Sequence, residues 1–175
     1  AELYQKIGVA YEIVTDFDVL RVPSEFYKFL SLMSIKEKER QRIKNYAETL
    51  RKIVDDSVNV IGLSEQEIED AKKGKRKEVY HKQGINFFDD KLKTKIRETL
   101  DYLSLHHLHI LETGELETLL EEYGVVYKEK RFWIIDAINK IAELTNEDIT
   151  PESKVYQFIQ KIIINKQFGV MNKDE

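Results

Sequence analysis

The chain of 175 residues contains no cysteine, two prolines and seven glycines. Without cysteine it can form no disulfide, no cysteine-ligated zinc site and no thiol nucleophile, and we expect a cytoplasmic protein. The scarcity of proline and glycine leaves little material for flexible linkers, so we expect one compact unit. No apolar run approaches the roughly 20 residues of a membrane-spanning helix, and we expect no membrane partner.

The chain also lacks an excess of positive charge. Its 28 lysine and arginine residues are outnumbered by 32 aspartate and glutamate residues. This balance argues against a protein that coats nucleic acid through bulk charge, so a DNA contact would need a local basic patch or a bound cation. One basic run is a candidate patch, although such runs are usually solvated helix faces and the intervening Glu78 reduces its charge. Its residues are Lys72, Lys73, Lys75, Arg76, Lys77 and Lys82.

The residue pattern predicts an α/β fold that is predominantly helical, with a small parallel sheet. A nearly continuous β-branched run from Ile7 to Thr15 is typical of a buried strand, and Leu105 to Leu111 is the second strand candidate. We expect four successive parts: the first strand and its acids in 1–21, a long helical insertion in 22–104, the second strand and C-terminal helices in 105–166, and a loose tail in 167–175.

Local signals place the helices within these parts. Pro23 suits the first turn of a helix. Apolar residues at intervals of three and four predict one long amphipathic helix within 35–60, whose stripe needs a partner. Ser64 and Glu67 have the spacing of a capping box, so a helix should begin there and end near Gly74. Further helices are predicted over 92–103, 116–120, 131–144 and 150–166.

Two acids follow the first predicted strand. Side chains two apart on a strand point to the same side, so Asp16 and Asp18 would present both carboxylates at one spot. Open α/β sheets bind ligands at this carboxyl edge, and a divalent cation such as Mg²⁺ or Mn²⁺ would relieve the repulsion between the two anions. Alternatively, one aspartate caps the next helix and the other is solvated.

A second acidic pair and two lysines follow the second predicted strand. Glu115 and Glu117 would converge with the aspartates if the two strands are neighbours, or they would simply complement a helix dipole. Lys128 and Lys130, close to Trp133, could neutralise charge on a phosphate during its transfer, or they could be solvated surface charges.

Three histidines lie in the second strand candidate. His107 and His109 would share one strand face, but no third ligand has matching spacing. We therefore expect His106, His107 and His109 to be surface or interface residues.

Taken in order, these motifs resemble the C-terminal Toprim region of the OLD (overcoming lysogenization defect) family of ATP-dependent nucleases. The resemblance covers most of the chain. It rests on the strand ending in Asp16-Phe17-Asp18, the long helical insertion, the turn Lys82-Gln83-Gly84-Ile85, the segment His-Leu-His-Ile-Leu-Glu-Thr-Gly-Glu-Leu-Glu at 107–117 and the segment Lys-Glu-Lys-Arg-Phe-Trp at 128–133.

The resemblance implies a metal-dependent endonuclease that cleaves DNA with one or two Mg²⁺ or Mn²⁺ ions. It also implies a homodimer and an N-terminal ABC-type ATPase domain in the parent protein, through which alone ATP would act. Several proteins of the family act in bacterial defence against phage. By this resemblance the metal ligands are Asp16, Asp18, Glu115 and Glu117, and the catalytic lysine is Lys130 or Lys128.

The chain departs from that family in two respects. No earlier strand supplies the glutamate of a Glu-Gly turn, and no Gly-x-x-x-x-Gly-Lys-Ser/Thr motif is present. We therefore expect a truncated Toprim region, with half a metal site and little activity alone.

Two other functions are compatible with these residues. The segment 13–19 also resembles the first motif of haloacid dehalogenase-type phosphatases, with Asp16 as nucleophile and Asp18 as acid/base. A non-catalytic helical module would instead bind a partner through the stripe of 35–60 and the last helix.

Overall fold

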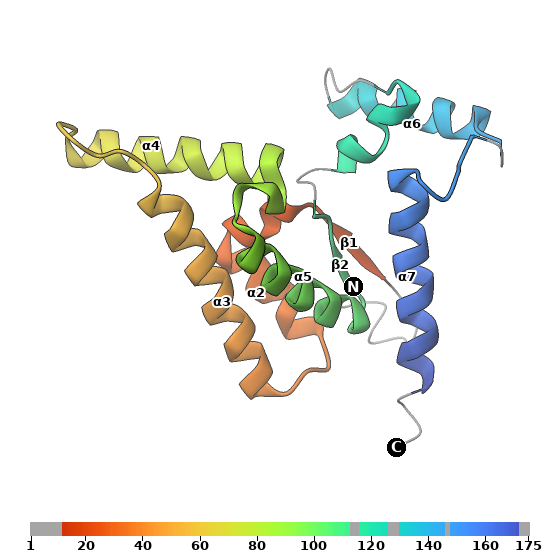
Figure 1. Ribbon diagram of the computed structural model, residues 1–175, viewed down its shortest axis with the longest axis horizontal. Coiled ribbons are helices and arrows are strands. Elements are labelled where there is room, and N and C mark those ends of the chain that lie inside the picture. The colour runs from red at the N-terminus through yellow and green to blue at the C-terminus, as the bar shows by residue number, and fades with distance from the viewer. Residues whose placement is uncertain (1–11, 113–115, 126–129, 146–147, 172–175) are drawn as a thin grey trace. The chain divides into compact units, whose positions relative to one another are not determined.

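The computed structural model describes residues 12–112, 116–125, 130–145 and 148–171 (Figure 1). The chain divides into two compact units, Ala1–Gly114 (unit 1) and Glu115–Glu175 (unit 2). The boundary falls inside the segment 105–166, where the sequence indicated one continuous part. The single compact unit expected from the shortage of proline and glycine is thus replaced by two.

Unit 1 is mostly helical and contains a small parallel sheet, which confirms this part of the predicted fold class. Strand β1 (Ile13–Thr15) pairs with β2 (Leu108–Ile110), and Ile13 lies opposite Leu108. Strand β2 is shorter than expected because the preceding helix runs as far as Leu105 and His107 then adopts a left-handed conformation with φ 68°. Only the following three residues extend beside β1.

The elements between the two strands are helical. Pro23 occupies the first turn of its helix, as predicted, and Ser64 and Glu67 form both halves of a capping box. In chain order the elements are η1 (Phe17–Arg21), α2 (Pro23–Leu32), α3 (Glu37–Asp56), α4 (Glu65–Lys77), the π-helical turn η2 (Glu78–Gln83), η3 (Gly84–Phe87) and α5 (Asp90–Leu105).

The core of unit 1 covers the apolar stripe of α3. Ile43, Leu50 and Val54 on this stripe are at most 2% exposed, and they belong to one buried cluster with residues of α2, α5 and the sheet. The partner that this stripe needs is therefore supplied by unit 1 itself. These three residues are therefore not open to another protein.

The prediction that α4 ends at Gly74 is wrong. The helix continues to Lys77 and passes directly into η2, and Gly84, with φ 55°, closes this run. Glycine inside a helix costs about 1 kcal/mol relative to alanine. Val79 and Tyr80, which follow, are both completely buried, and their burial outweighs this cost.

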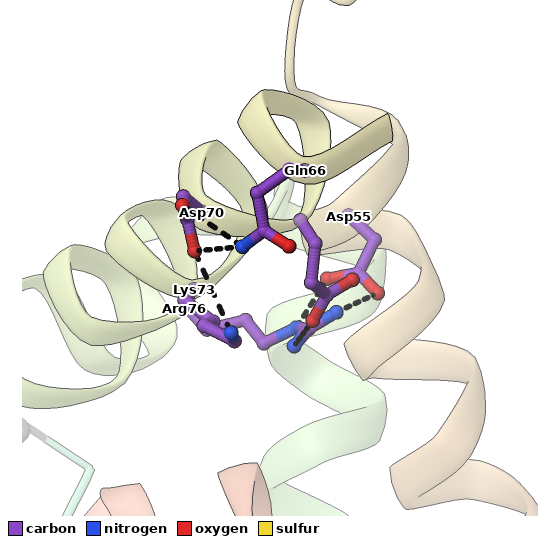
Figure 2. A network of polar contacts seen from close by, with 6 residues as sticks. Asp55, Gln66, Asp70, Lys73 and Arg76 are labelled. Carbon is purple, nitrogen blue, oxygen red and sulfur yellow. Dashed lines mark hydrogen bonds and ion pairs between the residues drawn. The ribbon is translucent and has the colours of Figure 1, made fainter. Parts of the chain in front are cut away.

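An ion pair joins α3 to α4 (Figure 2). Arg76 is 8% exposed and binds Asp55 with two parallel contacts, Nε to Oδ1 at 2.5 Å and Nη2 to Oδ2 at 2.7 Å. Its Nη1 also donates to Glu69 Oε1 at 3.3 Å. The contact with Asp55 raises the pKa of Arg76. Because this geometry is bidentate, it fixes the angle between the two helices as well as their separation.

Replacing Asp55 with asparagine should destabilise unit 1. The change removes a charge-assisted bidentate contact and leaves the Arg76 guanidinium nearly buried without its main counter-ion, so we expect a loss of about 1–3 kcal/mol in the free energy of unfolding. Urea denaturation measures this loss. The matched control is Glu69→Gln, because Glu69 is half exposed and a contact of that kind is worth about 0–1 kcal/mol. Equal effects of the two changes would contradict this interpretation.

Unit 2 has a small core of its own, formed by Leu120, Val125 and Ala137. Two short turns replace the helix predicted over 116–120. Helix α7 (Lys154–Met171) begins three residues after Pro151 and extends as far as Met171, into the segment expected as a loose tail. The elements of unit 2 are η4 (Leu116–Leu119), η5 (Glu121–Tyr123), α6 (Lys130–Glu143) and α7 (Lys154–Met171). In both units, no helix within the described residues has the length and apolar character needed to cross a membrane.

Candidate functional site

The carboxyl ends of β1 and β2 meet at one edge of the parallel sheet. Thr15 accepts a backbone hydrogen bond from Leu111 at 3.0 Å, so the residues that follow the two strands are neighbours. Asp16 follows β1 directly, with extended backbone angles, at the N-cap position of η1. Its side chain makes no capping hydrogen bond to this turn, so the alternative that Asp16 caps the next helix through its carboxylate is not what the structure shows.

Asp18 lies in η1 and not on the strand. Asp16 and Asp18 therefore do not share a strand face as expected, because β1 ends at Thr15. The Asp18 carboxylate, 28% exposed, lies 3.3 Å from His81 Nε2 and 3.8 Å from an Arg21 guanidinium nitrogen. Two basic groups thus face this acid from two different elements.

His81 reaches Asp18 because an aromatic stack brings η1 and η2 together. The Phe17 and Tyr80 rings are parallel to within 24°, with centroids 5.6 Å apart, and both side chains are completely buried. Asp18 and His81 are the next residues along their respective segments, so the stack places them side by side. The π-helical winding of η2 is of a kind found often at functional sites.

No pattern in the sequence pointed to His81, because a π-helical turn has no clear residue pattern. The usable hint was the apolar pair Val79-Tyr80 immediately after a basic run, which indicates a return to the core. Glu112 was also missed. It follows β2, its carboxylate binds Arg97 Nε at 2.9 Å, and its backbone oxygen accepts from Ile85. Both strands of the sheet are thus followed by acids at the same edge.

The remaining predicted acids and lysines belong to unit 2 or lie outside the described residues. Glu117 lies in η4 and Lys130 is the first residue of α6, both in unit 2. Glu115 and Lys128 lie outside the described residues. The convergence of four carboxylates therefore stays a prediction. Among the residues described, no group of three or more histidines and acids is arranged to hold a metal ion.

The basic run divides into one structural residue and a group of surface lysines. Arg76 is the buried partner of Asp55 and is not available to a phosphate backbone. Lys73 lies 3.5 Å from Asp70, and Lys75 lies 3.2 Å from Glu78 and also over the Phe87 ring. Lys77 and Lys82 are exposed and Lys72 is partly exposed.

A separate hydrogen-bonded chain lies at the amino end of the sheet. His109 is 3% exposed, contrary to the surface position expected, and its Nδ1 and Nε2 lie 2.6 Å from Ser104 Oγ and 2.8 Å from Glu12 Oε2. His107 Nδ1 also contacts Glu12, at 3.1 Å, so the two histidines do reach the same carboxylate. Ser104 is 3% exposed, and no substrate could reach its hydroxyl. This serine–histidine–glutamate chain therefore ties β1 to β2 and is not a nucleophilic site.

The stack beneath Asp18 can be tested through Tyr80. Its hydroxyl is buried and has no hydrogen-bond partner among the described residues, and burial raises its pKa. Tyr80→Phe should therefore keep or slightly raise the melting temperature, because it removes only an unsatisfied polar group. Tyr80→Ala should lower the free energy of unfolding by about 3–5 kcal/mol, since it empties a core position. Thermal and urea denaturation of the two variants measures these changes in stability. A large loss of stability in Tyr80→Phe would mean that the Tyr80 hydroxyl makes a hydrogen bond.

Comparison with known proteins identifies no relative. No protein-family model, no curated protein and no solved structure matches this chain. The function must therefore be inferred from the residues and their arrangement.

Proposed function

We propose that this chain carries the acidic metal site of a DNA endonuclease, a Toprim-like domain that hydrolyses phosphodiester bonds with Mg²⁺ or Mn²⁺. The observation that carries the proposal is the position of Asp16 and Asp18 at the carboxyl edge of a parallel strand pair, the edge at which open α/β sheets bind their ligands. Both carboxylates are partly exposed, so a cation and a phosphate could reach them.

Two carboxylates suit these cations. Mg²⁺ is usually bound through one or two carboxylates and keeps several water molecules, so Asp16 and Asp18 are a sufficient start for a site. Further carboxylates from Glu115 and Glu117 would complete it, as the resemblance to the OLD family implies. When bound, the metal would polarise the scissile phosphate and lower the pKa of the attacking water.

The neighbouring basic groups have distinct roles in this proposal. His81 holds one oxygen of Asp18 through its Nε2 and so orients the carboxylate for the cation, as second-sphere partners of metal ligands do. Arg21 lies beside the same carboxylate and can approach a phosphate oxygen. Lys130, or Lys128, would neutralise the charge that develops on the phosphate during cleavage.

DNA is the proposed substrate, with the exposed lysines of the basic run as backbone contacts. Lys77 and Lys82 are the best placed of these, because both are exposed; Lys77 directly precedes the turn that carries His81, and Lys82 lies within it. An N-terminal ATPase domain in a longer parent protein, a homodimeric assembly and a role in phage defence belong to the same proposal and rest on the resemblance alone.

The proposal predicts a divalent cation site at Asp16 and Asp18. Titration of the ¹⁵N-labelled chain with Mn²⁺ should broaden the amide signals of residues 16–18 and 111–112 first, and Mg²⁺ should reverse the broadening by competition. The double variant Asp16→Asn, Asp18→Asn should bind Mn²⁺ at least about 100-fold more weakly, because loss of a second-sphere partner alone costs about 10–100-fold.

The control for this experiment removes two other carboxylates. Asp56 and Asp136 are exposed and lie in α3 and α6, so Asp56→Asn with Asp136→Asn makes the same change in net charge. This variant should bind Mn²⁺ as the unmodified chain does and should keep any Mn²⁺-dependent nicking of supercoiled plasmid. If the unmodified chain shows no localised broadening, or the aspartate variant retains it, the metal site is not at this edge. Hydrolysis of p-nitrophenyl phosphate without plasmid nicking would favour the phosphatase alternative.

His81 provides an independent test of the proposed site. His81→Ala removes the group that orients Asp18 and should weaken Mn²⁺ binding about 10–100-fold. His81→Gln keeps a side-chain hydrogen-bond donor and should recover much of this affinity. Isothermal titration with Mn²⁺ measures both. An equal loss in the two variants, accompanied by a lower melting temperature, would mean that His81 acts only through the stability of unit 1.

A further inference from the structure

An apolar turn projects from unit 1 where α3 and α4 meet. Ile61 at the apex of this turn is 88% exposed, and Val60 and Leu63 on either side are 42% and 38% exposed. In Figure 1 the turn stands at the far end of the two helices, away from the sheet. Turns are usually polar, so three large apolar side chains in solvent here need an explanation beyond folding. We call residues 60–63 the arm tip.

The arm tip has a defined conformation. Leu63 donates a backbone hydrogen bond to Val60 at 3.4 Å, Asn59 Oδ1 accepts one from the Ile61 amide at 3.2 Å, and Gly62 has the positive φ of 78° that such a turn requires. These contacts hold the turn in one conformation, which lowers the entropy lost when Ile61 binds.

The charged residues nearest the arm tip in the sequence are acidic. Residues 53–71 include six acids and no lysine or arginine. Asp55 is paired with Arg76, but Asp56, Glu65 and Glu67 remain exposed beside the tip. DNA and anionic lipid surfaces would be repelled by such a surface. The arm tip therefore fits a protein surface that offers an apolar hollow bordered by basic side chains.

Unit 1 itself carries a surface of this kind. A groove of about 240 Å³ lies between α3 and α5; Tyr46 and the nearly buried Ile43 are its apolar lining, and Asn45, Thr49 and Thr99 are its uncharged polar lining. The charged residues that line it are both basic, Arg42 and Lys95. Arg42 also pairs with Glu39, and the Lys95 ammonium lies over the Tyr46 ring at 5.1 Å from the centroid. The Tyr46 hydroxyl is buried and has no hydrogen-bond partner among the described residues.

We propose that the arm tip of one copy of this chain docks into the α3–α5 groove of a second copy. Ile61 would enter the hollow beside Tyr46, and the acids around the tip would meet Arg42 and Lys95. The contact cannot form within one copy, because Tyr46 and Asp56 lie on the same helix, about 15 Å apart along its axis. The proposal names a contact for the homodimeric assembly proposed above, but it does not rest on the proposed metal site, since it uses none of the residues of the sheet edge.

The two surfaces differ from each other, so each contact is heterologous. Two copies can exchange tips and close into a two-fold dimer, or successive copies can join tip to groove in a ring or longer assembly. A contact of this size is small, and its dissociation constant should be on the order of micromolar. Because acids meet basic residues at its border, it should weaken as salt is raised.

Sedimentation equilibrium of the full chain over a range of concentrations tests the contact. The unmodified chain should associate reversibly, and less so at high salt. Ile61→Asp should weaken association at least about tenfold, since it places a charge at the centre of the contact. Ile61 contacts little within its own chain, so circular dichroism should show unchanged folding. The matched control is Ile138→Asp, because Ile138 is 62% exposed but lies in unit 2. This variant should associate as strongly as the unmodified chain.

A charge exchange identifies the two surfaces as partners. Glu65→Lys on the tip side and Lys95→Glu in the groove should each weaken association. A mixture of the two variants should associate more strongly than either variant alone, because the altered tip then meets the altered groove. The proposal is overturned if the chain stays monomeric at hundreds of micromolar, if Ile61→Asp associates like the unmodified chain, or if the mixture shows no recovery. Loss of association in Ile138→Asp alone would assign self-association to α6.

Discussion

The arrangement of unit 1 depends on the buried stack of Phe17 on Tyr80. This contact joins the turn after β1 to the π-helical turn after α4, two segments that are far apart in the sequence. Apolar burial of two aromatic rings supplies the energy, and the fixed geometry of stacking supplies the direction. The polar residues beside the rings, Asp18 and His81, are consequently held next to each other at the edge of the sheet. A hydrophobic contact thus positions the candidate chemical groups.

The parts of the fold that could be predicted from the sequence are those decided locally. Pro23 and the capping box of Ser64 and Glu67 mark helix starts through contacts within a few residues, and both appear as expected. The parallel pairing of β1 and β2 agrees with two apolar segments separated by helices. The end of α4 was predicted wrongly at Gly74 because the low helix propensity of glycine is only a local preference. The burial of residues beyond Gly74 is a tertiary effect, and it outweighs that preference.

The candidate site shows the same division. The place of Asp16 could be predicted because it follows a strand, and the carboxyl ends of neighbouring parallel strands lie at the same edge of the sheet. His81 could not, since its place depends on the winding of η2 and on the stack beneath it. The basic run predicts that Arg76 contacts nucleic acid, but its actual partner is Asp55 on another helix. Pairings across helices of this kind leave no pattern in a single sequence.

The order of the strands in the chain has a consequence for biosynthesis. β1 is made before the described helices of unit 1, and β2, its partner among the described residues, is made after them. Until β2 has left the ribosome, the main-chain groups of β1 lack the hydrogen bonds that β2 makes with them, and Asp16 lacks β2 beside it. The acidic edge is therefore assembled at the end of the synthesis of unit 1. A ribosome-bound chain that stops before Leu108 would carry the aspartates without the sheet edge that presents them.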